Sequence, residues 1–363
     1  MALATGLLAA SHAFAQDKTL VYCLEASPEG FDPALFAGGE TLDASANQMY
    51  DGLVNFEIGA TKVVPGIAEK WELSDDGLEI VFHLRSGVKF HTTDYFTPTR
   101  DVNADDVLFT FNRQRDKTNP FYKAADGKFL WFGWMDMGNL IKDVVKVDDK
   151  TVKFVLDHPE APIMANLAMA FASVMSAEYA DILVAEGRID DLSNKPIGTG
   201  PFEFVTYQKD AVIRYVANDD YWNGRPKLDN LIFAITPDPS VRYQKLTAGE
   251  CDMIPFPLPA DLPAIAKDPN INLMEQEGLN VGYLAYNTEK KPFNDVRVRK
   301  ALREAKADDE VRAIMLHIDS PGGTVAGSRE LADEVTATRE NKRVYAHIDD
   351  LGASAGYNLA SRA

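Results

Sequence analysis

Alternation of apolar and polar positions marks the clearest strand of the chain, at residues 78–85. Its apolar side chains fall on one face: Ile80, Phe82 and Leu84. This period of two is typical of a half-buried strand. Asp75-Asp76-Gly77 comes directly before it and is a turn signal, because Gly tolerates positive φ. Residues 71–74 read as a partner strand, so the pattern predicts a β-hairpin.

A capped helix is predicted after a long loop. Asn103 is a favourable N-cap residue, and Asp105 and Asp106 lie in the first turn, where the helix dipole favours anions. The apolar positions that follow have helical spacing: Val107, Leu108 and Phe111. A hairpin, a loop and a capped helix form a scaffold and no catalytic motif, so this region predicts an α/β globular protein.

The same reasoning predicts further elements. Strands are expected at residues 18–25, 140–147, 151–156, 271–276, 280–287, 311–318 and 344–348, and helices at 44–53, 161–169, 240–248 and 328–339. Gly198 and Gly200 flank Thr199 and run into a strand, so a phosphate-binding loop, which would open a helix, is disfavoured. The Pro-rich residues 255–260 read as a crossover between lobes.

An aromatic cluster lies on a Gly-punctuated loop. Its members are Phe129, Trp131, Phe132 and Trp134. Exposed aromatic side chains on a loop often cover a ligand, but they can equally fill the core between subdomains. The sequence leaves both alternatives open.

Composition narrows the classes of function. The chain has 363 residues, enough for two or three domains, and its apolar content of 46% is ordinary for a globular protein. The net charge of −18 argues against a nucleic-acid-binding surface. The six histidines show no metal-binding spacing, so no metal site is expected. His91 and Asp94 are close in sequence, where surface hydrogen bonding is the simplest reading.

Three features of the sequence bear on whether the protein is exported: its N-terminal residues, its longest apolar runs and its cysteines. Residues 1–15 resemble a signal peptide, because Ala13-Phe14-Ala15 fits an A-x-A cleavage site, although no Lys or Arg precedes Lys18. No apolar run reaches the ~20 residues of a membrane-spanning helix. The chain has two cysteines, Cys23 and Cys251. In an exported protein an even count suggests a disulfide, and two buried thiols are the alternative.

Residues 66–111 resemble the signature region of the periplasmic dipeptide- and oligopeptide-binding proteins that serve ABC importers. They read GIAEKWELSDDGLEIVFHLRSGVKFHTTDYFTPTRDVNADDVLFTF. The resemblance recurs in PIGTGPF at residues 196–202 and in PFNDVRVRKAL at residues 292–302. It covers residues 16–302 in total, about four fifths of the chain.

The resemblance implies a periplasmic-binding-protein-like (type II) α/β fold. Residues 16–258 would form the first peptide-binding lobe and residues 259–302 the start of a truncated second lobe. The family pairs the matching cysteines, which implies a Cys23–Cys251 disulfide. The part of the family that grips the termini of the peptide would follow residue 302, and nothing there resembles it.

The resemblance also implies ligand contacts, partners and location. Ala37, Gly38 and Gly39 would lie at the edge of the cleft and pair their backbone with the peptide, like an added strand. Phe129 and Trp131 are further candidates for ligand contact. The expected partners are di- or short peptides and the membrane subunits of an ABC permease. The protein would be a periplasmic monomer of a Gram-negative bacterium, without a cofactor.

Residues 303–363 are similar to a different group. A predicted strand, Ser320-Pro321-Gly322-Gly323, a helix, a strand and the sequence ASAGY resemble signal peptide peptidase A and the phage capsid proteases. This likeness implies a partial ClpP/crotonase-like β-α-β-α fragment. Ser354 matches the nucleophile, and Gly322 and Gly323 match the oxyanion-hole region. The group's lysine base follows its serine, but no lysine follows Ser354, so this resemblance implies an inactive fragment.

Three hypotheses of function follow. The first is a non-catalytic, periplasmic substrate-binding component of an ABC importer for dipeptides or short peptides. The second is a serine/lysine peptidase carried by the C-terminal segment. The third is a chimeric gene product, genuine or an assembly artefact, in which neither activity is intact.

Overall fold

The computed structural model describes residues 17–275, 296, 313–320 and 343–352. The chain divides into two units, residues 1–268 and 269–363, which are treated separately here. No helix among the described residues is both long and apolar enough to cross a membrane.

The first unit contains a mixed sheet, which we call the N-terminal sheet. Its strand order is β1-β10-β9-β8. The bounds are β1 Thr19–Leu24, β8 Phe202–Gln208, β9 Val212–Ala217 and β10 Asn230–Ile235. β1 runs parallel to β10, whereas the other pairs are antiparallel. The predicted first strand and the strand after residues 196–202 are therefore confirmed.

The second sheet contains the predicted hairpin, and we call it the hairpin sheet. Its antiparallel order is β4-β5-β7-β6. The bounds are β4 Ala68–Leu73, β5 Glu79–Leu84, β6 Ile141–Asp148 and β7 Thr151–Leu156. Ile80, Phe82 and Leu84 are buried as the alternation predicts, and Gly77 takes a φ of +70° in the turn. A short sheet pairs β2 Val54–Phe56 with β3 Val63–Pro65.

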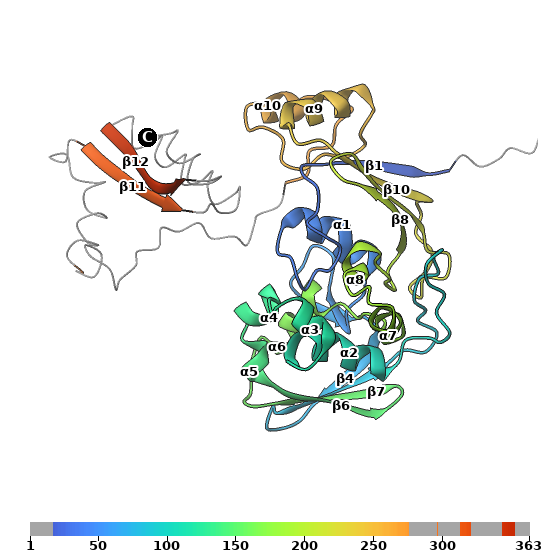
Figure 1. Cartoon of the computed structure of the whole chain (residues 1–363). Coiled ribbons are helices and arrows are strands. Elements are labelled where there is room, and N and C mark those ends of the chain that lie inside the picture. Colours follow the sequence, from blue (N-terminus) through green and yellow to red (C-terminus); the bar gives the residue numbers. More distant parts are fainter. Residues whose placement is uncertain (1–16, 276–295, 297–312, 321–342, 353–363) are drawn as a thin grey trace, which may run out of the picture. The chain divides into compact units, whose positions relative to one another are not determined.

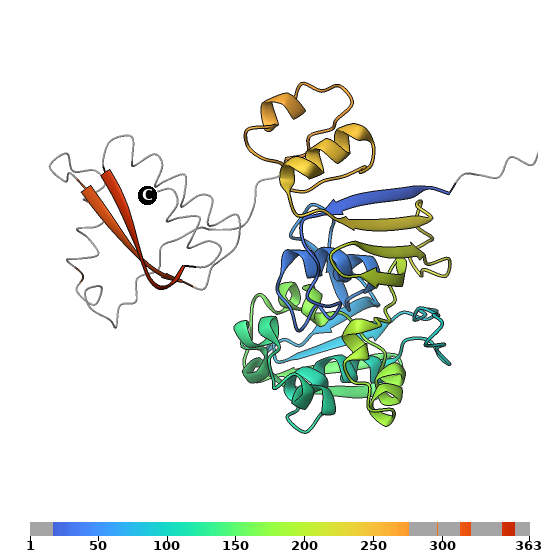
Figure 2. The same ribbon diagram turned by 45° about the horizontal axis from the view of Figure 1, so that its top comes forward.

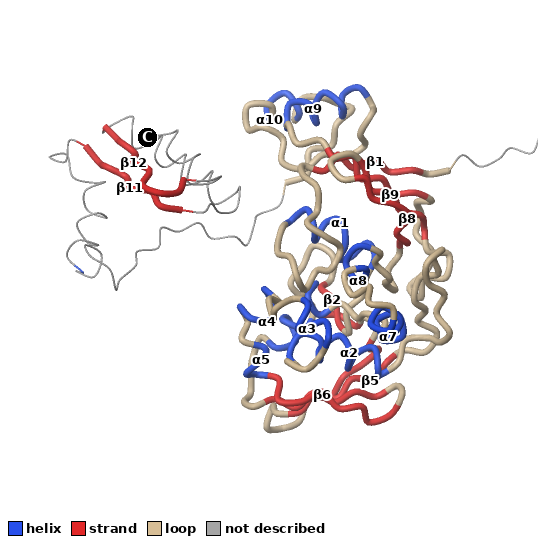
Figure 3. The backbone as a smooth tube through the Cα atoms, in the orientation of Figure 1, coloured by secondary structure: helices blue, strands red, loops and turns tan. Residues whose placement is uncertain are grey.

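Most helices of the first unit lie between the two larger sheets (Figures 1 and 3). They are α1 Gly39–Met49, α2 Ala104–Arg115, α3 Pro120–Ala124, α4 Leu130–Trp134, α5 Met137–Leu140, α6 Ile163–Leu167, the 3₁₀ helix Ala170–Ala172, α7 Ala177–Ala185 and α8 Asp191–Asn194. The remaining two, α9 Pro239–Ala248 and α10 Leu262–Ile265, lie beyond the N-terminal sheet (Figure 2).

The predicted capping of α2 is confirmed. The Asn103 side chain accepts a hydrogen bond from the Asp105 N–H, and Asp106 reaches back to the Asn103 N–H in a capping box. Asp106 is fully buried and also receives two hydrogen bonds from Arg100, at 2.7 and 2.9 Å. The buried carboxylate therefore both caps the helix and pairs with a cation.

Four predicted elements differ in the structure. The helix expected at residues 44–53 is α1, which begins at Gly39 and ends at Met49, because Gly38 in extended conformation serves as its N-cap. The aromatic loop contains α4, and the helix expected at residues 161–169 is shorter. Residues 271–275 form no strand. Met274 directly follows Leu273 and breaks the alternation in that segment, which pairs with no strand among the described residues.

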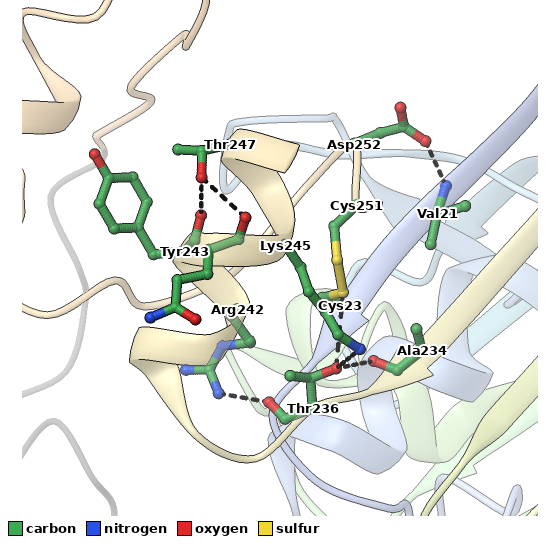
Figure 4. Close-up of a disulfide and its surroundings, with 11 residues drawn as sticks. Val21, Cys23, Ala234, Thr236, Arg242, Tyr243, Lys245, Thr247, Cys251 and Asp252 are labelled. Carbon is green, nitrogen blue, oxygen red and sulfur yellow. Dashed lines mark hydrogen bonds between the residues drawn. A yellow bond between two sulfur atoms is a disulfide. The ribbon is translucent and has the colours of Figure 1, made fainter. Parts of the chain in front are cut away.

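The predicted disulfide is present. Cys23 in β1 and Cys251 after α9 are joined across 228 positions, with Cα atoms 5.9 Å apart (Figure 4). The same segment pairs with β1 at two more points. Asp252 accepts a hydrogen bond from the Val21 N–H at 2.7 Å, and Met253 forms a parallel bridge with Tyr22. These contacts fasten the chain that follows α9 to the N-terminal sheet.

In the second unit, β11 Ala313–Ser320 and β12 Arg343–Gly352 are paired. They run parallel, with Ala313 opposite Arg343. Both match strands predicted from the sequence. The helix expected at residues 328–339, the strand at 280–287 and the residues Gly322, Gly323 and Ser354 lie outside the described residues, as does the predicted signal peptide.

Candidate functional site

The start of α1 is an open edge of backbone. Gly38 is the N-cap residue with φ −63° and ψ 138°, and Gly39 is the first, exposed residue of the helix. A Cβ added to Gly39 would meet no atom within 4 Å. The first N–H groups of a helix have no partner within the helix. An extended ligand could therefore approach this backbone and hydrogen-bond to it.

Charged side chains of both signs surround this edge. Tyr22 in β1 donates a hydrogen bond to Asp43 in α1 at 3.4 Å. Burial, and next the charge of Glu40, raise the pKa of the Glu25 carboxyl. Arg242 in α9 is 3% exposed and donates to the carbonyls of Thr236 and Pro237, and burial lowers its pKa. Carboxylates held close together in this way attract a cationic group such as an ammonium.

A cavity of about 210 Å³ adjoins the same edge. Its lining includes Leu35 and Phe36, which directly precede Ala37, and Glu29, whose carboxylate would lie 3.4 Å from a Cβ on Gly38. Phe129, which the sequence suggested as a ligand residue, also lines it. The cavity is thus a mainly apolar hollow beside the open backbone.

A buried ion pair forms part of the cavity wall. Arg113 and Asp32 are each 1% exposed and joined by two hydrogen bonds, at 2.5 and 2.9 Å. The Phe129 ring centroid lies 5.4 Å from the Arg113 guanidinium carbon, in a cation–π contact. The sequence analysis did not predict the ion pair between Arg113 and Asp32. The helical spacing of Asp106, Thr110 and Arg113, all buried, was the available signal.

The other aromatic residues of the predicted cluster, Trp131, Phe132 and Trp134, have different environments. Phe132 is buried in the core, and Trp131 packs edge-on against Trp134, with centroids 5.2 Å apart. Trp131 is not among the residues that line the cavity. Phe129 therefore fits both alternatives for the aromatic cluster. It fills the core, because it is only 3% exposed, and it also lines the cavity where a ligand could bind.

The turn at residues 196–202 holds the other end of α1. A Cβ on Gly198 would lie 1.8 Å from the Met49 carbonyl oxygen, so no larger residue fits. The Gly200 N–H donates to the same oxygen at 2.8 Å. Close approach of backbone to backbone explains both glycines, and the turn thereby fixes the helix whose start forms the site.

His91 supports this turn and is not a surface residue, which corrects the sequence-based reading. It is 1% exposed, and its Nε2 lies 2.9 Å from the Gly200 carbonyl oxygen. The Gly198 N–H points at Nδ1 from 3.4 Å, so Nε2 carries the proton and donates. Burial lowers the His91 pKa to about 4. The exposed Asp94 takes no part in this arrangement.

A second buried polar group supports α1 just beyond its end. Asp51 is 5% exposed and accepts hydrogen bonds from Thr199, Tyr221 and Trp222 at 2.9 to 3.0 Å. Burial raises its pKa, and the three hydrogen bonds oppose that rise. The network therefore joins three segments that are far apart in sequence, next to the end of α1.

Among the described residues no group of three or more His, Cys, Asp or Glu side chains could hold a metal ion. The edge, the charged rim and the cavity offer backbone hydrogen bonds, charge and an apolar wall, which are the means of binding an extended, polar ligand.

Comparison with known proteins identifies the class. Residues 62–320 match the model of the bacterial extracellular solute-binding proteins, family 5, middle region. The chain is 54% identical over 296 residues to the dipeptide-binding protein of Escherichia coli (strain K12), a match of 82% of this chain and 55% of the relative. It is 48% identical over 310 residues to heme-binding protein A of Haemophilus influenzae, a match of 85% of this chain and 56% of that relative.

A solved structure gives the same answer. The fold matches the dipeptide-binding protein of Pseudoalteromonas sp. SM9913 in complex with Met-Leu, with a TM-score of 0.81 and 32% identity. The match covers 91% of this chain and 75% of the other. The chain belongs to family 5 of the bacterial extracellular solute-binding proteins and has their mixed α/β, periplasmic-binding-protein-like fold. It spans just over half the length of the two relatives named above.

Proposed function

We propose that this protein binds dipeptides or short peptides as the substrate-binding component of an ABC importer and carries out no catalysis. The observation that carries the proposal is the match to a dipeptide-binding protein in complex with Met-Leu. The open backbone at Gly38 and Gly39 fits a ligand that pairs like an added strand. The membrane subunits of the permease are the partners, and the protein acts as a monomer.

We assign residues 16–258 to the first peptide-binding lobe and residues 259–302 to the beginning of the second. The disulfide and the contacts of β1 with residues 252 and 253 support this division, because they fasten the end of the first lobe. In this proposal Ala37, Gly38, Gly39 and Phe129 contact the peptide directly. Trp131, which lies outside the cavity lining, contacts it from the neighbouring helix α4.

We place the protein in the periplasm of a Gram-negative bacterium. Residues 1–15 would be the signal peptide that directs export. The disulfide supports this location, because disulfides form and persist in oxidising compartments.

For residues 303–363 we propose an inactive fragment of the signal peptide peptidase A and phage capsid-protease type, with a partial ClpP/crotonase-like fold, in a chimeric gene product. The parallel pairing of β11 and β12 supports a strand-crossover-strand unit, since parallel neighbours need a long connection. We put the junction between residues 302 and 320, because the family 5 model extends to residue 320. Ser354 would be the unactivated nucleophile, beside Gly322 and Gly323.

Thermal unfolding of the purified chain with different ligands tests the proposal. A ligand that binds the native state at 100 times its Kd adds about 2.7 kcal/mol of stability. Met-Leu should raise Tm, whereas hemin, the ligand class of one relative, should not. No shift with Met-Leu at millimolar concentration would contradict peptide binding, and a shift with hemin alone would replace it. Labelling of Ser354 by a fluorophosphonate would contradict the inactive peptidase fragment.

A further inference from the structure

Arg113 places a buried hydrogen-bond donor in the wall of the cavity of about 210 Å³ beside α1. Its two terminal nitrogens donate to Asp32, whereas its Nε has no hydrogen-bond partner among the described residues. The side chain is 1% exposed. A buried donor without an acceptor is destabilising, so an acceptor that enters the cavity gains more here than an apolar group of the same size.

Apolar side chains form most of the remaining wall. Phe36 and Leu35 come from the loop before α1, Phe121 from α3, Phe129 from the residue before α4, and Leu192 from α8. Phe121 and Phe129 are 6% and 3% exposed. The interior of the cavity is therefore aromatic and aliphatic, with the unpaired Arg113 Nε–H in its wall.

The wall is held in place by a close approach at Gly30. A Cβ on Gly30 would lie 2.5 Å from the Phe36 ring and 2.5 Å from the Ser193 Oγ. The next residue, Phe31, donates its N–H to the Ser193 carbonyl at 3.1 Å. The glycine thus lets the loop before α1 pack directly against α8. The cavity is formed before a ligand enters, which lowers the entropic cost of binding.

The size and position of the cavity suit a single side chain of a peptide. Pockets that hold a whole small molecule measure about 300–1,000 Å³, which is more than this cavity offers. Leu35 and Phe36 directly precede Ala37, and residues of a strand are about 3.3 Å apart. A peptide paired with the backbone at Gly38 therefore lies within reach of the cavity. Successive side chains of an extended peptide alternate in direction, so one of two points toward it.

We propose that this cavity takes a methionine side chain of the bound peptide, with the thioether facing the Arg113 Nε–H. The proposal rests on the proposed peptide function. A thioether makes favourable contacts with aromatic rings and is a weak hydrogen-bond acceptor. A glutamine would bring an amide NH₂ that loses its water among the phenyl rings. The exposed carboxylates of Glu29 and Asp190, which also line the cavity, disfavour an acidic side chain.

Titration calorimetry with homodipeptides tests the proposal, because a homodipeptide offers the same side chain at both positions. The ligands are Met-Met, its norleucine counterpart with a methylene in place of sulfur, and Ala-Ala, whose side chains end at Cβ. Wild type should bind Met-Met at least tenfold more tightly than Ala-Ala and about twofold more tightly than the norleucine peptide. A purely apolar pocket would instead favour norleucine, the more apolar side chain.

Ala124→Trp tests the pocket from the side of the protein. Ala124 is exposed and lines the cavity, so an indole there blocks the pocket without disturbing the core. This variant should bind Met-Met at least tenfold more weakly than wild type and Ala-Ala equally well. Lys123→Trp is the matched control, because Lys123 is exposed on the same helix but does not line the cavity. It should bind Met-Met like wild type.

The possible failures distinguish the pocket from the function. If wild type bound none of the three dipeptides at millimolar concentration, the proposed function and the pocket would both be overturned. If wild type bound them but the norleucine peptide bound at least as tightly as Met-Met, the pocket alone would be overturned, and this comparison needs no variant. The same holds if Ala124→Trp, shown to be folded by thermal unfolding, bound Met-Met as wild type does.

Discussion

Arg113 and Asp32 form a doubly hydrogen-bonded ion pair in the interior of the first unit, and each is 1% exposed. Removal of one partner leaves a buried charge without compensation, which costs about 3–5 kcal/mol. Arg113→Met or Asp32→Ala should therefore lower the free energy of unfolding by that amount in urea denaturation. The double variant should lose less than the sum of the two single variants, and strict additivity would contradict a direct pair.

The His91 imidazole should make stability depend on pH. Its pKa is about 4 in the folded state against an ordinary value near 6.5, so the unfolded chain binds the proton more tightly. The contribution is present above pH 6.5 and is lost as pH falls toward 4, by about 3 kcal/mol. We expect His91→Gln to remove this part of the pH dependence in denaturation curves at pH 7 and pH 4. Parallel curves for wild type and variant would contradict it.

Helices, strands and caps could be predicted well from the sequence, but contacts between residues far apart in the chain could not. The alternation around Phe82 and the Asn103 cap are set by neighbours a few residues away, and both are confirmed. The burial of His91 and the partners of Asp51 depend on segments more than 100 positions distant, which no local pattern contains. The resemblance to a family predicted the disulfide, which the structure contains, whereas the strand predicted at residues 271–276 is absent over residues 271–275.

The disulfide should be a large part of the stability of the first unit. Loss of a cross-link that spans 228 positions costs about 5 kcal/mol in the chain-entropy model. The Cys23→Ser/Cys251→Ser variant should unfold at correspondingly lower urea concentration, and so should the wild type in a reducing agent. Reduction should not destabilise the variant further. An unchanged wild-type curve after reduction would contradict the structural role of the bond.

Gly198 should tolerate no side chain. A Cβ there would lie 1.8 Å from the Met49 carbonyl oxygen, so Gly198→Ala forces α1 and the turn apart at a cost of about 3 kcal/mol. Gly133→Ala is the matched control, because a Cβ at this helical position meets nothing within 4 Å. Chemical denaturation should separate the two variants clearly. Equal stability would show that the turn does not determine the position of α1.

The central claim is that a peptide binds against the exposed backbone at the start of α1. Its most direct test is titration calorimetry of Met-Leu with wild type, Gly39→Val and Gly133→Ala. A Cβ at Gly39 meets no protein atom within 4 Å, and Gly39 is exposed, so the variant should fold normally yet bind Met-Leu at least tenfold more weakly, while Gly133→Ala should bind like wild type. Equal affinity in all three proteins, or no binding by the wild type at millimolar peptide, would contradict the claim.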